Sequence, residues 1–194
     1  MPLMLQTLKE LLTAPHEALP KKAKMKDRNE TIVMLVMNWI LVAIGIALVL
    51  NNYSLGPAIL VLGILGTLVT AFFIYLAFTV VGGKGDYTSA LISLTYPFFG
   101  VSFSTLAISI ISIWSEVASI FIGIILFSLY FTVGLTGMFR VLKENFKTDL
   151  VSVWIVISLL ILAIVLSVYK LTAIYTLKTI SSGSLISNLI ARLT

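Results

Sequence analysis

The chain has 194 residues, of which 59% are hydrophobic and 11% charged, and its formal net charge is +5. These proportions exclude an ordinary soluble domain, in which about 25% of residues are charged. The absence of cysteine excludes a disulfide framework, a thiolate metal site and a cysteine nucleophile. The first long apolar block begins only at Thr31 and is too long for the core of a signal peptide, so we expect no cleaved signal.

Residues 4–14 are predicted to form an amphipathic helix that is too short to cross a membrane. Its apolar residues recur on one face, at Met4, Leu5, Leu8, Leu11 and Leu12. Pro15 is expected to end this helix, because proline lacks an N–H donor. The helix would either lie among lipid headgroups as a membrane-binding or partner-binding arm, or pack on the bundle's own cytoplasmic face. A basic run completes this cytoplasmic segment of residues 1–30, at Lys21, Lys22, Lys24, Lys26 and Arg28.

Five long apolar blocks follow, and none of them contains an acidic, basic or histidine residue. They cover residues 31–50, 57–81, 93–114, 117–139 and 150–169, the last of which can extend to 177. About 20 apolar residues, each rising about 1.5 Å along a helix, match the roughly 30 Å hydrocarbon core of a bilayer. We therefore predict an all-α integral membrane protein: a five-helix transmembrane bundle over residues 31–177, preceded by the amphipathic interfacial helix. Residues 178–194 are predicted to be a short tail, either a second interfacial helix or a frayed end.

Hydroxyl-bearing residues recur along the third block. Ser102, Thr105, Ser109 and Ser112 follow a near-heptad spacing. Small residues allow close helix packing in lipid, where association depends on van der Waals contact. The alternative is a hydroxyl-lined conduction path, for which Tyr96 and Pro97 would supply a kink and a gate.

Lysine and arginine residues predict the orientation, because they are retained on the cytoplasmic side of a membrane. Six precede the first block, and the second and fourth connections between blocks carry Lys84, Arg140, Lys143 and Lys147. The other two connections, residues 51–56 and 115–116, carry none. We therefore expect a multi-pass protein of the cell membrane with its N-terminus in the cytoplasm and its C-terminus outside.

The connection after the second block has the most unusual local sequence. It contains Gly82, Gly83, Lys84, Gly85 and Asp86. A tight turn is the simplest interpretation, because glycine permits positive φ and close backbone approach. The sequence also fits the GxGD pattern of aspartyl intramembrane proteases, whose two carboxylates share a proton. Asp149 is the first candidate for the second carboxylate, and Asp27 and Glu30 are the less favoured ones. We expect Asp86 instead to cap the helix that begins near Tyr87.

The order of these connections resembles the Yip family, the Ypt/Rab-interacting membrane proteins, in its prokaryotic-type members. The elements that carry the resemblance are Leu12-Thr13-Ala14-Pro15, Gly82-Gly83-Lys84-Gly85 followed by Tyr87, Tyr96-Pro97, Val133-Gly134-Leu135 followed by Arg140, and Phe146-Lys147-Thr148. They extend over residues 3–170. The resemblance implies a five-helix bundle with a cytoplasmic N-terminus, in agreement with the charge pattern.

The expected function is that of a non-enzymatic membrane scaffold that organises partner proteins or lipids through its cytoplasmic face. That face would comprise the amphipathic helix, the basic run Lys21–Arg28, the turn Gly82–Tyr87 with Lys84, and the segment Arg140–Lys147. The expected partners are membrane lipids and other membrane proteins or a second copy, and no nucleic acid. No catalytic, metal-binding or cofactor-binding residue is assigned, and His16 is the only histidine. The alternatives are a passive channel or small-solute transporter and, more remotely, a GxGD-type aspartyl protease.

Overall fold

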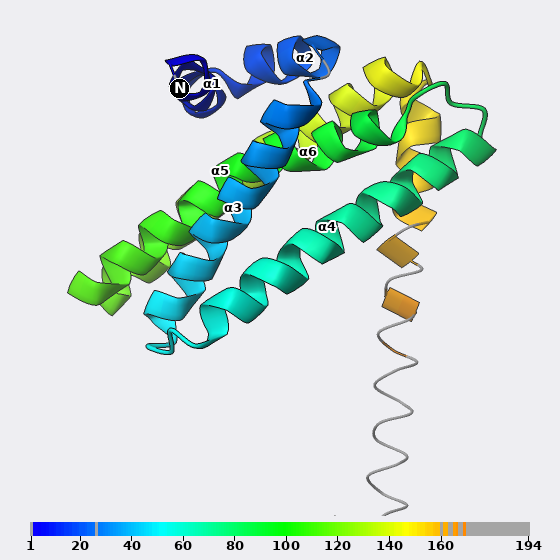
Figure 1. Cartoon of the computed structure of the whole chain (residues 1–194). Helices are drawn as coiled ribbons and strands as arrows, with labels where there is room; N and C mark the ends of the chain where they lie inside the picture. The colour runs from blue at the N-terminus through cyan, green and yellow to red at the C-terminus, as the bar shows by residue number, and fades with distance from the viewer. Residues whose placement is uncertain (1, 26, 160, 163–164, 167–168, 170–194) are drawn as a thin grey trace, which may run out of the picture. The chain divides into compact units, whose positions relative to one another are not determined.

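The structure is a computed structural model that describes residues 2–25, 27–159, 161–162, 165–166 and 169. These residues are all-helical and contain no strand. The chain divides into two compact units, Met1–Trp154 and Ile155–Thr194. The first unit contains α1 (Pro2–Thr13), α2 (Pro15–Met25), α3 (Arg28–Val49), α4 (Leu55–Val80), α5 (Tyr87–Trp114) and α6 (Glu116–Phe146) (Figure 1).

Four of these helices, α3 to α6, are long and apolar enough to cross a membrane. A shorter apolar helix, Leu150–Leu159, begins the fifth predicted block. Part of the remainder of that block, and the whole predicted tail at 178–194, lie outside the described residues. The all-helical class and four apolar helices of spanning length are therefore confirmed, while the count of five spans stays a prediction.

The helices extend beyond the apolar blocks, and the two longest extensions are at the start of α5 and the end of α6. The third block was predicted from residue 93, whereas α5 begins at Tyr87 because Asp86 caps it. The fourth block was predicted to residue 139, whereas α6 continues to Phe146 and ends at Lys147, whose φ is 53°. Charged residues end an apolar block without ending a helix, since Arg140 and Glu144 pair across one helical turn.

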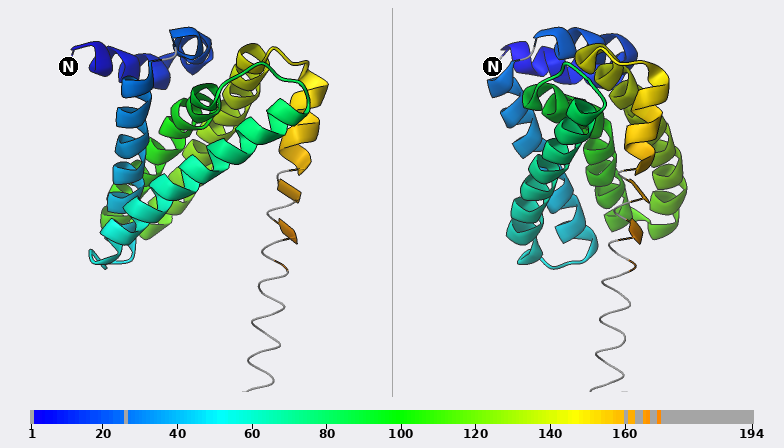
Figure 2. Two further views of the ribbon diagram at one scale, coloured as in Figure 1. Left: turned by 45° about the vertical axis from the view of Figure 1, so that its right-hand side comes forward. Right: turned by 90° about the vertical axis from the view of Figure 1, so that its right-hand side faces the viewer.

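Helix α5 occupies the centre of the first unit and packs against α3, α4 and α6 (Figures 1 and 2). Small residues on the neighbouring helices allow this close contact. A Cβ atom added to Gly45 of α3 would lie 3.1 Å from Oγ of Ser109, and one added to Gly134 of α6 would lie 2.9 Å from the carbonyl oxygen of Pro97. The α5 helix continues through Pro97, and α6 packs directly against that part of its backbone.

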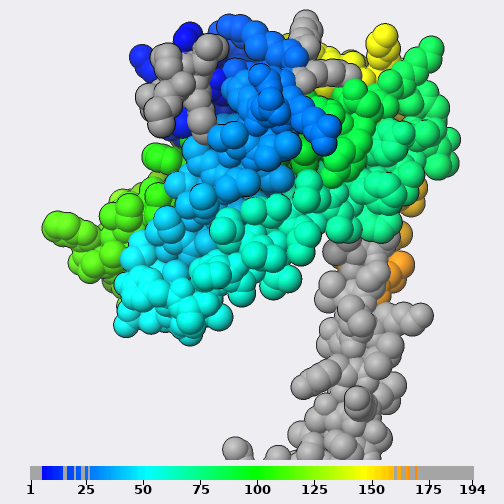
Figure 3. Space-filling view, in the orientation of Figure 1, coloured from blue at the N-terminus to red at the C-terminus, as the bar shows by residue number. Residues whose placement is uncertain are grey.

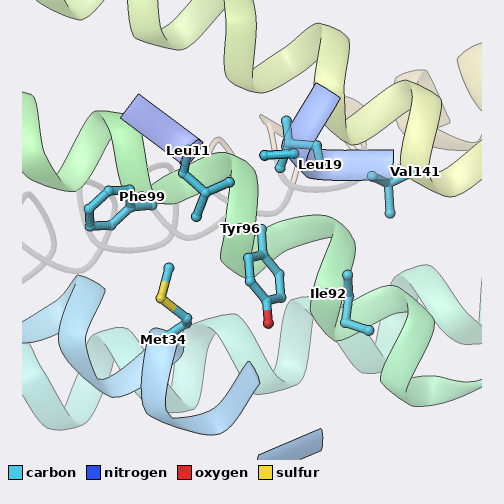
Figure 4. Close-up of a cluster of buried hydrophobic side chains, with 8 residues drawn as sticks. Leu11, Leu19, Met34, Ile92, Tyr96, Phe99 and Val141 are labelled. Atoms are coloured by element: carbon cyan, nitrogen blue, oxygen red, sulfur yellow. The ribbon is translucent and has the colours of Figure 1, made fainter. Parts of the chain in front are cut away.

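Helices α1 and α2, called here the N-terminal arm, cover one end of this bundle (Figure 2). Pro15 does end α1, but it also begins α2, because proline suits the first position of a helix. The arm contributes Leu11, Ala18 and Leu19 to a buried cluster that includes Tyr96 of α5 (Figure 4). Leu11 of α1 is thus packed against the bundle, while the amphipathic interfacial helix stays a prediction.

The glycine turn between α4 and α5 lies against the end of α6. The N–H of Lys84 donates to the carbonyl of Phe146 at 2.9 Å, and the fully buried rings of Phe146 and Phe78 stack with centroids 4.6 Å apart. Gly82 has a positive φ of 86°. A Cβ atom added to Gly85 would lie 2.5 Å from the ring of Phe146. Glycine is therefore needed in this turn for two reasons: the positive φ at Gly82 and the close contact of Gly85 with Phe146.

The close contact at Gly85 predicts that Gly85→Ala destabilises the protein. The added methyl group overlaps a fully buried ring, and overpacking of this kind costs about 1–3 kcal/mol. Gly56→Ala is the matched control, because a Cβ atom there meets nothing within 4 Å. Thermal unfolding of the detergent-solubilised protein should show a lower midpoint for Gly85→Ala than for the control, and equal midpoints would contradict this account of the turn.

Candidate functional site

The exposed basic side chains of the first unit gather at the end that the N-terminal arm covers. Hydrogen bonds join the segments that carry them: Lys22 of α2 reaches Glu30 of α3, and Lys84 reaches the end of α6. Figure 3 shows α2 and the start of α3 on the surface at this end. The exposed members of this group, called here the basic end, are Lys9, Lys21, Arg28, Lys84, Arg140, Lys143 and Lys147.

The carboxylate of Glu30 holds the arm in place. Its Oε1 atom accepts hydrogen bonds from Oγ1 of Thr7 at 2.9 Å and from Nζ of Lys22 at 2.8 Å. The Lys22 and Glu30 side chains are only 7% and 19% exposed, so water screens this ion pair less than a surface pair. Asp27 caps α3 by accepting from the N–H groups of Asn29 and Glu30, which fixes the first turn that carries Glu30.

The predicted Lys24 and Lys26 lie outside the residues whose side chains the structure describes, and the other predicted basic residues divide into two groups. Lys21, Arg28 and the four basic residues of the later connections are exposed at one end, as the charge pattern indicated. Lys22 is buried in its pair with Glu30 and helps to dock the arm, so it is not part of the exposed surface. The contacts of Glu30 with Thr7 and Lys22 were not predicted from the sequence, because they join residues of different helices.

The exposed residues of α6 include one weak ion pair. Nε of Arg140 lies 3.3 Å from Oε1 of Glu144, one helical turn away, and the Arg140 side chain is 56% exposed. Such exposed pairs contribute little to stability, typically 0.2–1 kcal/mol, so about that much must be lost for Arg140 to bind another anion. Lys143 and Lys147 flank this pair and are both exposed.

Asp86 and Asp149 both act as helix caps. Asp86 accepts from the N–H of Ser89 at 2.7 Å, so the expected cap on α5 is confirmed. Asp149 accepts from the N–H of Ser152, also at 2.7 Å. Hydrogen bonds from Ser152 hold the pKa of Asp149 below its ordinary value of 3.8. Two carboxylates that share a proton act strongly on each other's pKa, whereas the charge that acts on Asp149 is that of Lys143 and not that of Asp86.

The hydroxyl groups of α5 are largely used within that helix. Ser102, Thr105, Ser109 and Ser112 each donate to a backbone carbonyl three or four residues earlier. Ser102 and Ser109 are buried, and Gly45 of α3 packs against Ser109 and Thr105. These contacts favour helix packing over a polar conduction path. Among the described residues, no group of three or more histidine, cysteine or acidic side chains could hold a metal ion.

A buried polar contact between α3 and α5 was not predicted. Nδ2 of Asn38 donates to the carbonyl oxygen of Thr95 at 2.7 Å, and the Asn38 side chain is fully buried. A single asparagine inside an apolar block carries no periodic signal, so only the structure identifies its partner. No family model, curated protein or solved structure matches the chain, so its function is inferred from its own residues.

The Glu30 contacts predict that Glu30→Gln loosens the N-terminal arm. The substitution removes the charge that pairs with Lys22, and a hydrogen bond to a charged group contributes about 1.5–3 kcal/mol. Amide hydrogen exchange in α1 and α2 should therefore become at least about tenfold faster.

Glu10→Gln is the matched control, because it makes the same chemical change at a half-buried residue whose carboxylate bonds only to Gln6 among the described residues. Exchange in the arm of this variant should match that of the unmodified chain. Equal exchange in Glu30→Gln and Glu10→Gln would show that the ion pair does not hold the arm.

Proposed function

We propose that the chain is a non-enzymatic, multi-pass membrane scaffold that organises anionic lipids and partner proteins through its basic end. The observation that carries the proposal is that exposed lysine and arginine side chains from the arm, the α4–α5 turn and the end of α6 meet at one end of long apolar helices. The Yip-type resemblance agrees with this role, as does the proposed five-span layout.

The charge pattern supports a cytoplasmic position for the basic end. Basic residues flanking membrane helices are retained in the cytoplasm, and the opposite connections, at residues 51–54 and Ser115, carry none. With five spans, the N-terminus lies in the cytoplasm and the C-terminus outside the cell membrane. The cytoplasmic leaflet is rich in anionic lipid, which attracts each nearby basic residue by about 1 kcal/mol.

The docked arm supports a rigid binding surface. The apolar residues Leu11 and Leu19 are 3% and 2% exposed, so they are already used within the protein. Attraction at the basic end therefore depends on charge, without insertion of these leucines into lipid. A surface of this kind binds anionic headgroups or acidic protein segments, and its affinity falls as salt concentration rises.

The same contacts give less support to the two alternatives. A channel needs polar groups that face a path, whereas the α5 hydroxyl groups donate to their own helix. A protease needs two coupled carboxylates, whereas Asp86 and Asp149 each cap a helix. A scaffold requires neither a polar path nor a coupled pair of carboxylates.

The topology can be tested by labelling single cysteines, because the chain contains none of its own. Asn52→Cys lies in the connection between α3 and α4, and Lys143→Cys lies in the last turn of α6 at the opposite end of the bundle. A membrane-impermeant thiol reagent added to intact cells should label the first and leave the second unlabelled until the cells are broken. Labelling of Lys143→Cys in intact cells would reverse the proposed orientation.

Neutralising the end of α6 should weaken binding. The combined variant Arg140→Gln, Lys143→Gln and Lys147→Gln removes three exposed charges, which at about 1 kcal/mol each corresponds to roughly a 100-fold loss of affinity for phosphatidylserine. Native mass spectrometry of the protein in mixed phosphatidylcholine and phosphatidylserine micelles measures the bound fraction.

The charge-conserving variant Arg140→Lys, Lys143→Arg and Lys147→Arg is the matched control and should retain binding. If neutralisation leaves phosphatidylserine binding unchanged, and purification from native membranes also recovers no stoichiometric protein, the proposed scaffold role is wrong.

A further inference from the structure

A groove of about 310 Å³ opens on the side of the bundle between α3, α4 and α5. Its walls are the half-buried rings of Trp39 and Phe98, whose centroids are 5.3 Å apart. Gly63 and Gly66 of α4 line the opposite side. A Cβ atom added to Gly66 would meet nothing within 4 Å, so the groove is open at this point.

The groove exists because the indole of Trp39 lies against the backbone of α4. A Cβ atom at position 63 would collide with this ring, so only glycine allows the contact. Nε1 of Trp39 donates to Oγ1 of Thr67 at 2.9 Å, which fixes the orientation of the indole. The indole of Trp39 also contacts the ring of Phe98 of α5. Next to these contacts, the space beside Gly66 is empty.

The lining favours an uncharged, apolar ligand. It contains no charged side chain, and its remaining residues are Leu62, Leu94 and Thr70. The hydroxyl of Thr67 donates to the carbonyl of Gly63, and that of Thr70 donates to Gly66. The polar side chains of the lining thus already have partners, and a hydrocarbon matches the remaining surface.

The position of the groove limits what can enter it. Trp39, Gly66 and Phe98 lie near the middle of α3, α4 and α5 respectively. In a spanning bundle this is the depth of the lipid hydrocarbon chains, away from headgroups and water. The groove is continuous with the exposed apolar face of α4, which includes Leu62, Leu65 and Val69.

The shape and lining of the groove suit a flexible hydrocarbon chain. The groove is open to the side of the bundle and lined mainly by apolar side chains, so a chain without polar groups can follow it.

We propose that this groove binds one hydrocarbon chain of a membrane lipid. The inference rests on the membrane-spanning arrangement proposed above, and it adds a binding site distinct from the basic end. Trp39 and Phe98 contact the chain from one side, and the absence of a side chain at Gly66 makes room for it.

Fluorescence quenching by brominated lipid tests the proposal. Trp114→Phe and Trp154→Phe leave Trp39 as the only tryptophan of the chain. This variant is reconstituted in phosphatidylcholine vesicles with or without bromine atoms near the middle of the acyl chains. We expect the brominated chains to reduce Trp39 emission by more than half.

Filling the groove should reverse this effect. Gly66→Leu places a side chain in the open space and should reduce the quenching of Trp39 at least twofold. Gly56→Leu is the matched control on the same helix, because its Cβ also meets nothing within 4 Å and it does not line the groove. Equal quenching in the two variants would overturn the proposal.

A reference tryptophan separates failure of the groove from failure of the membrane assignment. Phe131→Trp, at an exposed position near the middle of α6, is the sole tryptophan of a variant in which Trp39, Trp114 and Trp154 are phenylalanine. Quenching there without quenching of Trp39 would mean that protein covers the groove, as in a dimer, and would overturn the inference alone. Absence of quenching at both positions would overturn the spanning arrangement itself.

Discussion

The Glu30 carboxylate ties three helices together, and the position of the N-terminal arm depends on it. One oxygen atom accepts from Thr7 of α1 and from Lys22 of α2, while the residue itself belongs to the first turn of α3. The arm brings Leu11 and Leu19 onto the bundle, next to Tyr96. Without this anchor, the arm could separate from the bundle and expose its apolar residues.

The anchor also determines what remains available for binding. Lys22 is buried in the ion pair, whereas Lys21 and Arg28 on either side of it are exposed. A buried pair of this kind gains little net stability over an apolar contact, because both charges lose hydration. Its main consequence here is geometric: the arm has one docked position, and its exposed basic residues lie beside those of the α4–α5 turn and α6.

The sequence predicted the helices better than their contacts. Four charge-free blocks correspond to α3 to α6, because continuous apolar length depends only on local composition. The Asp86 cap was also predictable, because the aspartate directly precedes the helix that it caps. By contrast, α2 was missed because Pro15 was interpreted only as a terminator, and the burial of Lys22 was missed because its partner Glu30 lies on another helix. The contact between Trp39 and Gly63, which creates the groove, was likewise not predicted, because it joins residues of two different apolar blocks.

The contacts between α3 and α5 explain why the groove lies beside α4. Asn38 bonds to the Thr95 backbone midway along the pair, and Gly45 packs on Ser109 further along, so the two helices run in the same direction in close contact. Helix α4 buries far fewer side chains, and the Trp39 indole intervenes at Gly63. The tight pair and the arm thus form one packed body, while the looser contact of α4 leaves room at its side. No residue that lines the groove belongs to the arm or to the Glu30 contacts, so the proposed lipid-chain site and the proposed binding surface at the basic end share no side chain.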